Sequence, residues 1–254
     1  MDRRKIVLIG AGSAMFTQGL VADLILSGKP WRLGLVDVDP KALQVAEGLA
    51  KRMAQAREAD IIIDASVDRC DLLPGADVVV TTIGVGGRRA WEADVFIPRK
   101  YGNYQPVGDT IMPGGISRAL RMVPAMVDIA RDVEKLAPQA RFFNYANPMT
   151  VNTWAVRKAT GADMIGLCIG VPHVIHDLAR FIRKPIAEVT GLAVGVNHFT
   201  WVYDLRWQGK DAWPLVRAQY ARETGQAVVA PAGDAAPGGD TTLLDEAEGH
   251  TFRV

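Results

Sequence analysis

Long apolar runs, cysteines and excess charge are all scarce in this sequence of 254 residues. No stretch approaches the roughly 18 consecutive apolar residues that a membrane-spanning helix needs, so we expect no membrane partner. Two cysteines are too few for the disulfide framework of a small secreted protein, and we expect a reducing, cytoplasmic setting. A formal net charge of +1 gives no broad positive field, which argues against nucleic acid as a partner.

What remains is the composition of an ordinary globular protein, long enough for one large or two modest domains. Short β-branched runs alternate with segments of helical spacing through most of the chain. The expected strands cover residues 5–10, 32–39, 60–68, 76–84, 141–148 and 164–170, and the strongest helical pattern covers 116–136. This alternation predicts an α/β fold, a Rossmann-like doubly wound parallel sheet with helices on both faces. Residues 87–115 are rich in Gly, Pro and charge, and are expected to form a long loop with a short helix.

The texture of the sequence changes after residue 190. Longer strands with a turn near Gln208–Gly209 are expected there, which is typical of a separate α+β unit. We therefore expect a first domain at 1–190 and the start of a second at 191–254. The stretch 226–242 is rich in Ala, Gly and Pro without a clear period, and it predicts a linker or disorder.

The run GAGSAMF follows the first expected strand and opens a helix, as in a dinucleotide-binding turn. Gly10 permits the tight turn, Gly12 lets the backbone approach a pyrophosphate, and Ser13 begins the helix that meets the anion. Met15 stands in place of the third glycine. Asp37 ends the second strand, where a carboxylate accepts hydrogen bonds from a ribose diol and disfavours a 2′-phosphate, so NAD is favoured over NADP. The alternative is an ordinary glycine turn with a capping Ser13 and a surface Asp37.

Two further polar positions follow expected strands. Thr82, in TTIG, is placed to lie over a bound cofactor. Asn147 precedes Pro148, which restricts its backbone away from the helical region, at the edge of the sheet where ligands bind. The alternative for Asn147 is a cap on the helix that begins near Met149.

Cys168 and His198 raise the question of a metal site. Cys168 ends the apolar run MIGLC, and a lone cysteine there can equally be a small buried hydrophobe. His198 lies in GVNHFTW. A thiolate and an imidazole suit a divalent metal, with water or substrate oxygens completing the coordination.

The motifs VGDTIMPGGISRALR, NYANPM, GLC and GVNH, in this order after GAGSAMF, resemble glycoside hydrolase family 4. The resemblance covers roughly residues 4 to 215 and is strongest to the α-galactosidase, α-glucosidase and α-glucuronidase branch. It implies an NAD- and Mn²⁺-dependent glycosidase of α-glycosides, an exception to the two-carboxylate glycosidases. In that chemistry a hydride leaves C3 of the sugar, the leaving group departs by elimination, water adds, and the hydride returns.

The resemblance also implies roles for single residues. Cys168 and His198 match metal ligands, and Asn147 matches a substrate-binding position. The NAD site is matched by Gly10, Gly12, Ser13 and Asp37. Asp109, in GDT, is a candidate acid or substrate contact, with a loop-capping role as its alternative.

The chain also departs from the family pattern. Ile169 follows Cys168 where this branch usually has His, and no tyrosine can be assigned as the base. The chain looks C-terminally truncated, and a homo-oligomer, dimer or tetramer, is expected if the missing half is present. Two other interpretations stay open: a lactate/malate-type NAD-dependent dehydrogenase, with Arg88 and Arg89 after the fourth strand, and an NAD-binding module that has lost hydrolase activity.

Overall fold

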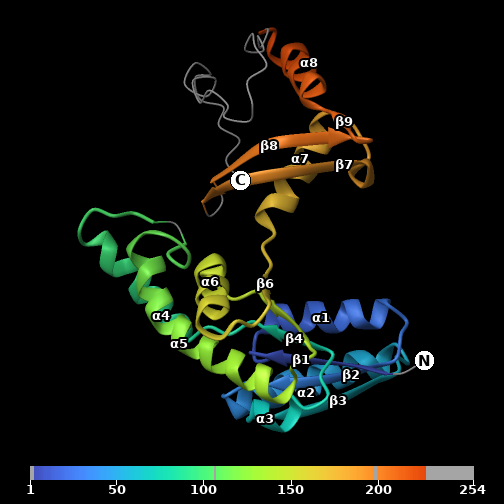
Figure 1. Cartoon of the computed structure of the whole chain (residues 1–254), viewed down its shortest axis with the longest axis vertical. Coiled ribbons are helices and arrows are strands. Elements are labelled where there is room, and N and C mark those ends of the chain that lie inside the picture. Colours follow the sequence, from blue (N-terminus) through green and yellow to red (C-terminus); the bar gives the residue numbers. More distant parts are fainter. Residues whose placement is uncertain (1–2, 106, 197–198, 227–254) are drawn as a thin grey trace. The chain divides into compact units, whose positions relative to one another are not determined.

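A computed structural model describes residues 3–105, 107–196 and 199–226 of the chain (Figure 1). Internal contacts divide the chain between Leu167 and Cys168 into two compact units. Each unit is described below by itself.

The first unit is built on a six-stranded sheet in which every neighbouring pair is parallel. The strand order is β3-β2-β1-β4-β5-β6, which confirms the predicted doubly wound sheet. The strands are β1 (Arg4–Ile9), β2 (Trp31–Val36), β3 (Ile61–Ser66), β4 (Val78–Thr81), β5 (Arg141–Asn144) and β6 (Met164–Gly166). The chain direction across the sheet reverses between β1 and β4, and a ligand crevice is expected beyond the carboxyl ends of strands at such a point.

Helices cover both faces of this sheet (Figure 1). They are α1 (Ala14–Leu26), α2 (Pro40–Ala56), α3 (Arg69–Leu72), α5 (Met112–Leu136) and α6 (Met149–Thr160), whereas α4 (Gly87–Arg99) packs against α5. Successive β1 residues face opposite sides: Leu8 packs in the cluster that includes Val21 of α1 and Leu43 of α2. Val7 packs in the cluster that includes Met122 and Met126 of α5. Two buried layers therefore hold the strands in place.

The region between β4 and β5 is more helical than expected. α4 has 13 residues, whereas a long loop with only a short helix was predicted, and α5 begins about one turn early. Long-range contacts explain the difference. Arg121 of α5 donates to both carboxylate oxygens of buried Asp94 in α4, at 2.9 and 2.6 Å. Buried Gln105 donates to the Asp94 carbonyl at 2.6 Å and accepts from the Gly114 amide at 3.3 Å, which fixes the first turn of α5.

The second unit is a small α+β assembly. Its elements are α7 (Gly170–Phe181), the 3₁₀ turn η1 (Ile186–Glu188), β7 (Val189–Val196), β8 (Phe199–Trp207), β9 (Lys210–Asp211) and α8 (Trp213–Thr224). The antiparallel strands follow the order β7-β8-β9, and the expected turn at Gln208–Gly209 joins β8 to β9. The sequence placed α7 in the first domain, because the boundary was expected at residue 190. In the structure α7 belongs to the second unit, since its Ile175 and Ala179 pack in one core with Leu205 of β8.

His198 and almost all of the stretch 226–242 lie outside the described residues. Within the described part of the chain, no helix is both long enough and apolar enough to cross a membrane.

The core of the first unit gives a direct test on α5. Met126 is 0% exposed, whereas Leu120 on the same helix is 74% exposed. Met126→Ala is expected to lower the free energy of unfolding by about 2–5 kcal/mol, because it leaves a cavity against the sheet. Leu120→Ala, the matched control, is expected to change it by less than about 0.5 kcal/mol. Urea denaturation followed by circular dichroism measures both, and equal losses would contradict this core.

The Asp94–Arg121 pair makes stability depend on pH. Burial raises the pKa of Asp94, but hydrogen bonds from Arg121 and Ser117 outweigh burial and hold the pKa below its usual range. A lowered folded-state pKa contributes stability above the unfolded value of about 3.9, and this contribution is lost as pH falls through the folded value. Asp94→Asn is therefore expected to cost about 3 kcal/mol at neutral pH. The difference in the free energy of unfolding between this variant and wild type should shrink below about pH 4.

Urea titrations at a series of pH values measure this gap. Asp163→Asn is the control, because Asp163 pairs with Arg157 at the surface and its side chain is 82% exposed. Its effect should stay small at every pH. A gap for Asp94→Asn that remains constant down to about pH 2 would contradict the lowered pKa of Asp94.

Candidate functional site

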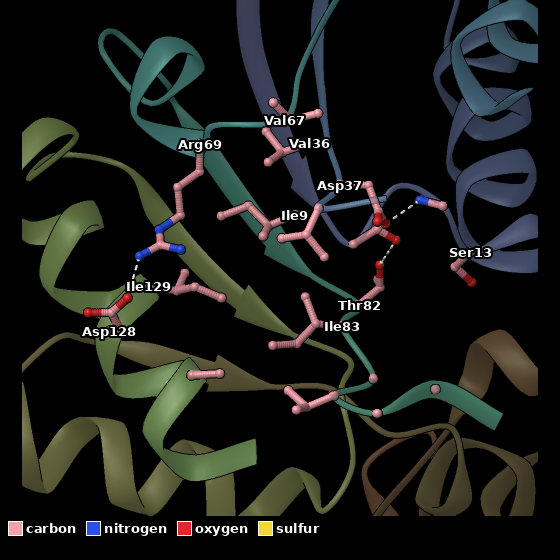
Figure 2. A pocket seen from close by; sticks show the side chains of 18 of the residues that line it. Ile9, Ser13, Val36, Asp37, Val67, Arg69, Thr82, Ile83, Asp128 and Ile129 are labelled. Atoms are coloured by element: carbon pink, nitrogen blue, oxygen red, sulfur yellow. Dashed lines mark hydrogen bonds and ion pairs between the residues drawn. The ribbon is translucent and has the colours of Figure 1, made fainter. Parts of the chain in front are cut away.

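A cleft of about 990 Å³ opens in the first unit, where β1, β2 and β4 end (Figure 2). Its walls are largely apolar, with side chains from several different elements: Ile9, Val36, Val67, Ile83 and Ile129. Polar groups are few and lie near the glycine turn and at the opposite wall (Figure 2). A concave apolar site with a few placed polar groups is typical of a cofactor or small-molecule site.

The turn between β1 and α1 has no room for side chains at two glycines. Gly10 has φ +98°, and a Cβ there would lie 2.8 Å from the backbone nitrogen of Ile83. A Cβ on Gly12 would lie 2.7 Å from Oδ2 of Asp37 and 2.8 Å from Cβ of Ala42. The Gly10 amide also donates to the carbonyl of Val36 at 2.8 Å. Both glycines are therefore required by the close approach of β1, β2 and β4.

Polar side chains at the ends of β2 and β4 hold this turn. Asp37 accepts a hydrogen bond at Oδ2 from the Gly12 amide at 2.7 Å and at Oδ1 from the Asp39 amide at 2.9 Å. The Thr82 hydroxyl donates to the carbonyl of Gly10 at 2.9 Å. Figure 2 shows the hydrogen bonds of Asp37 to Gly12 and of Thr82 to Gly10 meeting at the turn. Asp37 and Thr82 thus line the cleft and fix the glycine loop at the same time.

Ser13 occupies the N-cap position of α1 and lines the cleft, but its side chain makes no capping hydrogen bond. The alternative of an N-capping Ser13 is thus met in position but without the side-chain hydrogen bond of a cap. An N-terminus without a side-chain cap keeps amide donors for another acceptor, and a helix N-terminus at a cleft attracts an anion. The structure thus brings together Gly10, Gly12, Ser13, Asp37 and Thr82, all of them sequence-predicted site residues.

A second polar cluster involves the loop after β5. The Asn147 side-chain amide donates to Oδ2 of Asp109 at 2.9 Å, and the Thr110 hydroxyl donates to Oδ1 of Asp109 at 2.9 Å. The Asn147–Pro148 peptide bond is cis. The N-cap residue of α6 is Pro148, so the alternative in which Asn147 caps that helix is wrong. The structure instead pairs two predicted site residues, Asp109 and Asn147.

Arg118 of α5 joins this cluster and was missed by sequence reasoning. Its Nε donates to the main-chain carbonyl of Asn147 at 3.0 Å. Its Nη2 lies 3.7 Å from the position that a Cβ on Gly84 would take, and Gly84 lines the cleft. Burial lowers the pKa of Arg118, and the Asp109 carboxylate opposes that shift. The run RALR within the quoted motif was the available signal, but only the fold shows that its first arginine reaches Asn147.

Cys168 begins the second unit, just after β6, and its thiol is exposed. The Gly170 amide at the start of α7 donates to its sulfur at 3.4 Å. The alternative of a buried hydrophobe is therefore wrong. Ile169 is 61% exposed. No group of three or more His, Cys, Asp or Glu that could hold a metal occurs among residues 3–105, 107–196 and 199–226. With His198 outside that part, the Cys168 and His198 assignment stays a prediction.

Sequence comparisons identify full-length relatives. An α-galactosidase of Rhizobium meliloti is 39% identical over 210 residues, which are 81% of this chain and 43% of that protein. An α-glucosidase of Erwinia rhapontici is 36% identical over 221 residues, which are 85% of this chain and 49% of that protein. The chain thus spans about half the length of these relatives.

A solved structure and a family model agree with these relatives. The structure of the 6-phospho-β-glucosidase of Thermotoga maritima, with NAD and glucose-6-phosphate, matches with a TM-score of 0.74 and 25% identity, over 86% of this chain and 53% of that one. The model described as family 4 glycosyl hydrolase matches residues 5–184, which is well over half of the chain. The chain therefore belongs to family 4 of the glycosyl hydrolases.

Proposed function

We propose that this chain acts as a glycosidase that cleaves α-glycosides with NAD and a divalent metal, Mn²⁺, as its cofactors. The observation that carries the proposal is the cleft beyond β1 and β4, in which a glycine cradle without side chains faces the Asp37 carboxylate. The relatives named as an α-galactosidase and an α-glucosidase supply the substrate class.

The cleft residues fit a dinucleotide. Gly10 and Gly12 leave the backbone bare where a pyrophosphate approaches, and the first amides of α1 together with the Ser13 hydroxyl supply donors. Asp37 directly follows β2, and its carboxylate oxygens can accept hydrogen bonds from the hydroxyls of the adenosine ribose. Thr82 keeps the turn in place through Gly10. These residues bind and orient a cofactor, and the apolar walls exclude water from it.

The Asp109–Asn147 cluster fits a sugar. Each Asp109 oxygen accepts one hydrogen bond within the protein, which leaves further lone pairs for sugar hydroxyls. The Asn147 amide, fixed by Asp109 and by Arg118, is a substrate-binding group. Asp109 is the candidate general acid or substrate contact, and Arg118 holds the main chain of Asn147 while it faces that carboxylate.

We assign Cys168 and His198 as the protein ligands of the metal. The exposed Cys168 thiol is free to bind, and thiolate with imidazole is a suitable donor pair for a divalent ion. When bound, NAD takes up and returns a hydride while the metal draws electron density from sugar oxygens.

The exposed thiols of Cys70 and Cys168 also favour a reducing, cytoplasmic setting. A homo-oligomer is proposed for the whole protein.

A second function is supported by one observation. Ile169, beside Cys168, is 61% exposed, and its side chain can neither donate a proton nor bind a hydroxyl. A module that binds NAD without hydrolysing glycosides is therefore the competing proposal. The two differ in catalysis and not in cofactor binding.

Hydrolysis of p-nitrophenyl α-galactoside, α-glucoside and α-glucuronide by the purified chain separates the two functions. Reactions are run with and without NAD⁺ and Mn²⁺ under reducing conditions. The proposed glycosidase requires both additions, because redox and Lewis-acid steps both contribute. Cleavage without NAD⁺ would contradict the proposal, and NAD⁺ binding without any cleavage would favour the module.

Cysteine variants test the metal assignment in the same assay. Cys168→Ser is expected to lower the Mn²⁺-dependent rate by about 100-fold or more, because a soft thiolate ligand is lost. Its affinity for NADH should stay within about twofold. Cys70→Ser removes the other exposed thiol and should leave the rate unchanged. Equal rates for wild type and Cys168→Ser would overturn the metal assignment.

A further inference from the structure

The lining of the cleft carries more negative than positive charge. Among the described residues that line it, the ionisable ones are Asp37, Asp68, Arg69 and Asp128. Arg69 is therefore the one cation on that lining. Three carboxylates against one guanidinium leave an acidic surplus on the lining.

Arg69 is held by two carboxylates from a different element. Its Nη2 donates to Oδ2 of Asp128 at 2.6 Å, and its Nε donates to Oδ2 of Asp132 at 2.7 Å. The Arg69 side chain is 26% exposed and that of Asp132 is 28% exposed. Burial lowers the pKa of Arg69, but the bonds to Asp128 and Asp132 outweigh it and raise the pKa. The Asp128 side chain is more exposed, at 65%, and the two carboxylates together direct the guanidinium toward α5.

The direction of the side chain is informative. Figure 2 shows the Arg69 side chain running from the start of α3 toward Asp128 on α5, away from Asp37. Arg69 lines the same cleft as Asp37, the residue placed to bind the ribose, and NADP-binding folds place an arginine near that ribose for the 2′-phosphate. Here the donors that would make such a contact already point at Asp128 and Asp132.

We propose that Asp128 and Asp132 are specificity residues that sequester Arg69, and that this sequestration acts with Asp37 to exclude a 2′-phosphorylated dinucleotide. A phosphate of about two negative charges meets an acidic lining, and the one cation among the described lining residues, Arg69, is already paired with carboxylates. The neutral 2′-hydroxyl of NAD is not repelled by the carboxylates and needs no cation. The inference rests on the proposed dinucleotide function and names which dinucleotide the cleft accepts.

Neutralising the two carboxylates tests the proposal by binding rather than by catalysis. The double variant Asp128→Asn/Asp132→Asn is expected to bind NADPH about tenfold more tightly than wild type, because Arg69 becomes available to the 2′-phosphate. Its affinity for NADH should change by less than about twofold. Adding Arg69→Met to that pair should return NADPH to the wild-type affinity. Titrations of wild type and variants with each reduced cofactor, followed by nicotinamide fluorescence, measure these constants.

Controls separate the possible failures. Asp163→Asn removes one negative charge from a surface pair and should leave both affinities unchanged, and thermal unfolding checks that every variant is folded. Unchanged NADPH affinity in the double variant, or a gain that persists with Arg69→Met, would overturn sequestration while leaving the proposed function intact. Failure of wild type to bind NADH would instead remove the proposed function itself.

Discussion

The close approach of the β1–α1 turn to the ends of β2 and β4 is the constraint on which the site depends. Neither Gly10 nor Gly12 has space for a Cβ, because Ile83 backbone and the Asp37 carboxylate stand less than 3 Å from its position. Hydrogen bonds from Gly10 to Val36 and from Gly12 to Asp37 keep that distance short. The two apolar layers, one on each face of the sheet, hold the strands in place. A bare backbone next to a carboxylate follows directly, and that pairing suits a pyrophosphate joined to a ribose.

α5 lines one wall of the cleft and joins it to other parts of the first unit. One stretch of the helix packs against the sheet through Met122 and Met126. Arg118 reaches the loop after β5, and Arg121 clamps α4 and also donates to the carbonyl of Val85 in the cleft wall at 3.3 Å. Asp128 then meets Arg69 at the opposite wall. A single helix thus positions side chains around both the proposed cofactor cleft and the proposed sugar-binding cluster.

The parts that could be predicted from sequence are those with local causes. Apolar β-branched runs between helical segments predict the strands, and the spacing from Gly10 to Asp37 predicts the cleft. The extent of α4 could not be predicted, because it depends on Asp94 meeting Arg121, which lies 27 positions away. The Arg69–Asp128 pair, 59 positions apart, left no sequence signal either. The exposure of Cys168 was also hidden, since an apolar run ending in cysteine has the same pattern when it is buried.

The central claim is that this chain binds a dinucleotide on the glycine turn, and a calorimetric titration with NAD⁺ tests it most directly. Wild type is expected to bind one equivalent, as a single cleft at the switch point requires. Gly12→Ala is expected to weaken binding by about tenfold or more, because its Cβ displaces the Asp37 carboxylate. No heat from folded wild-type protein, or equal affinities for wild type and Gly12→Ala, would contradict the claim.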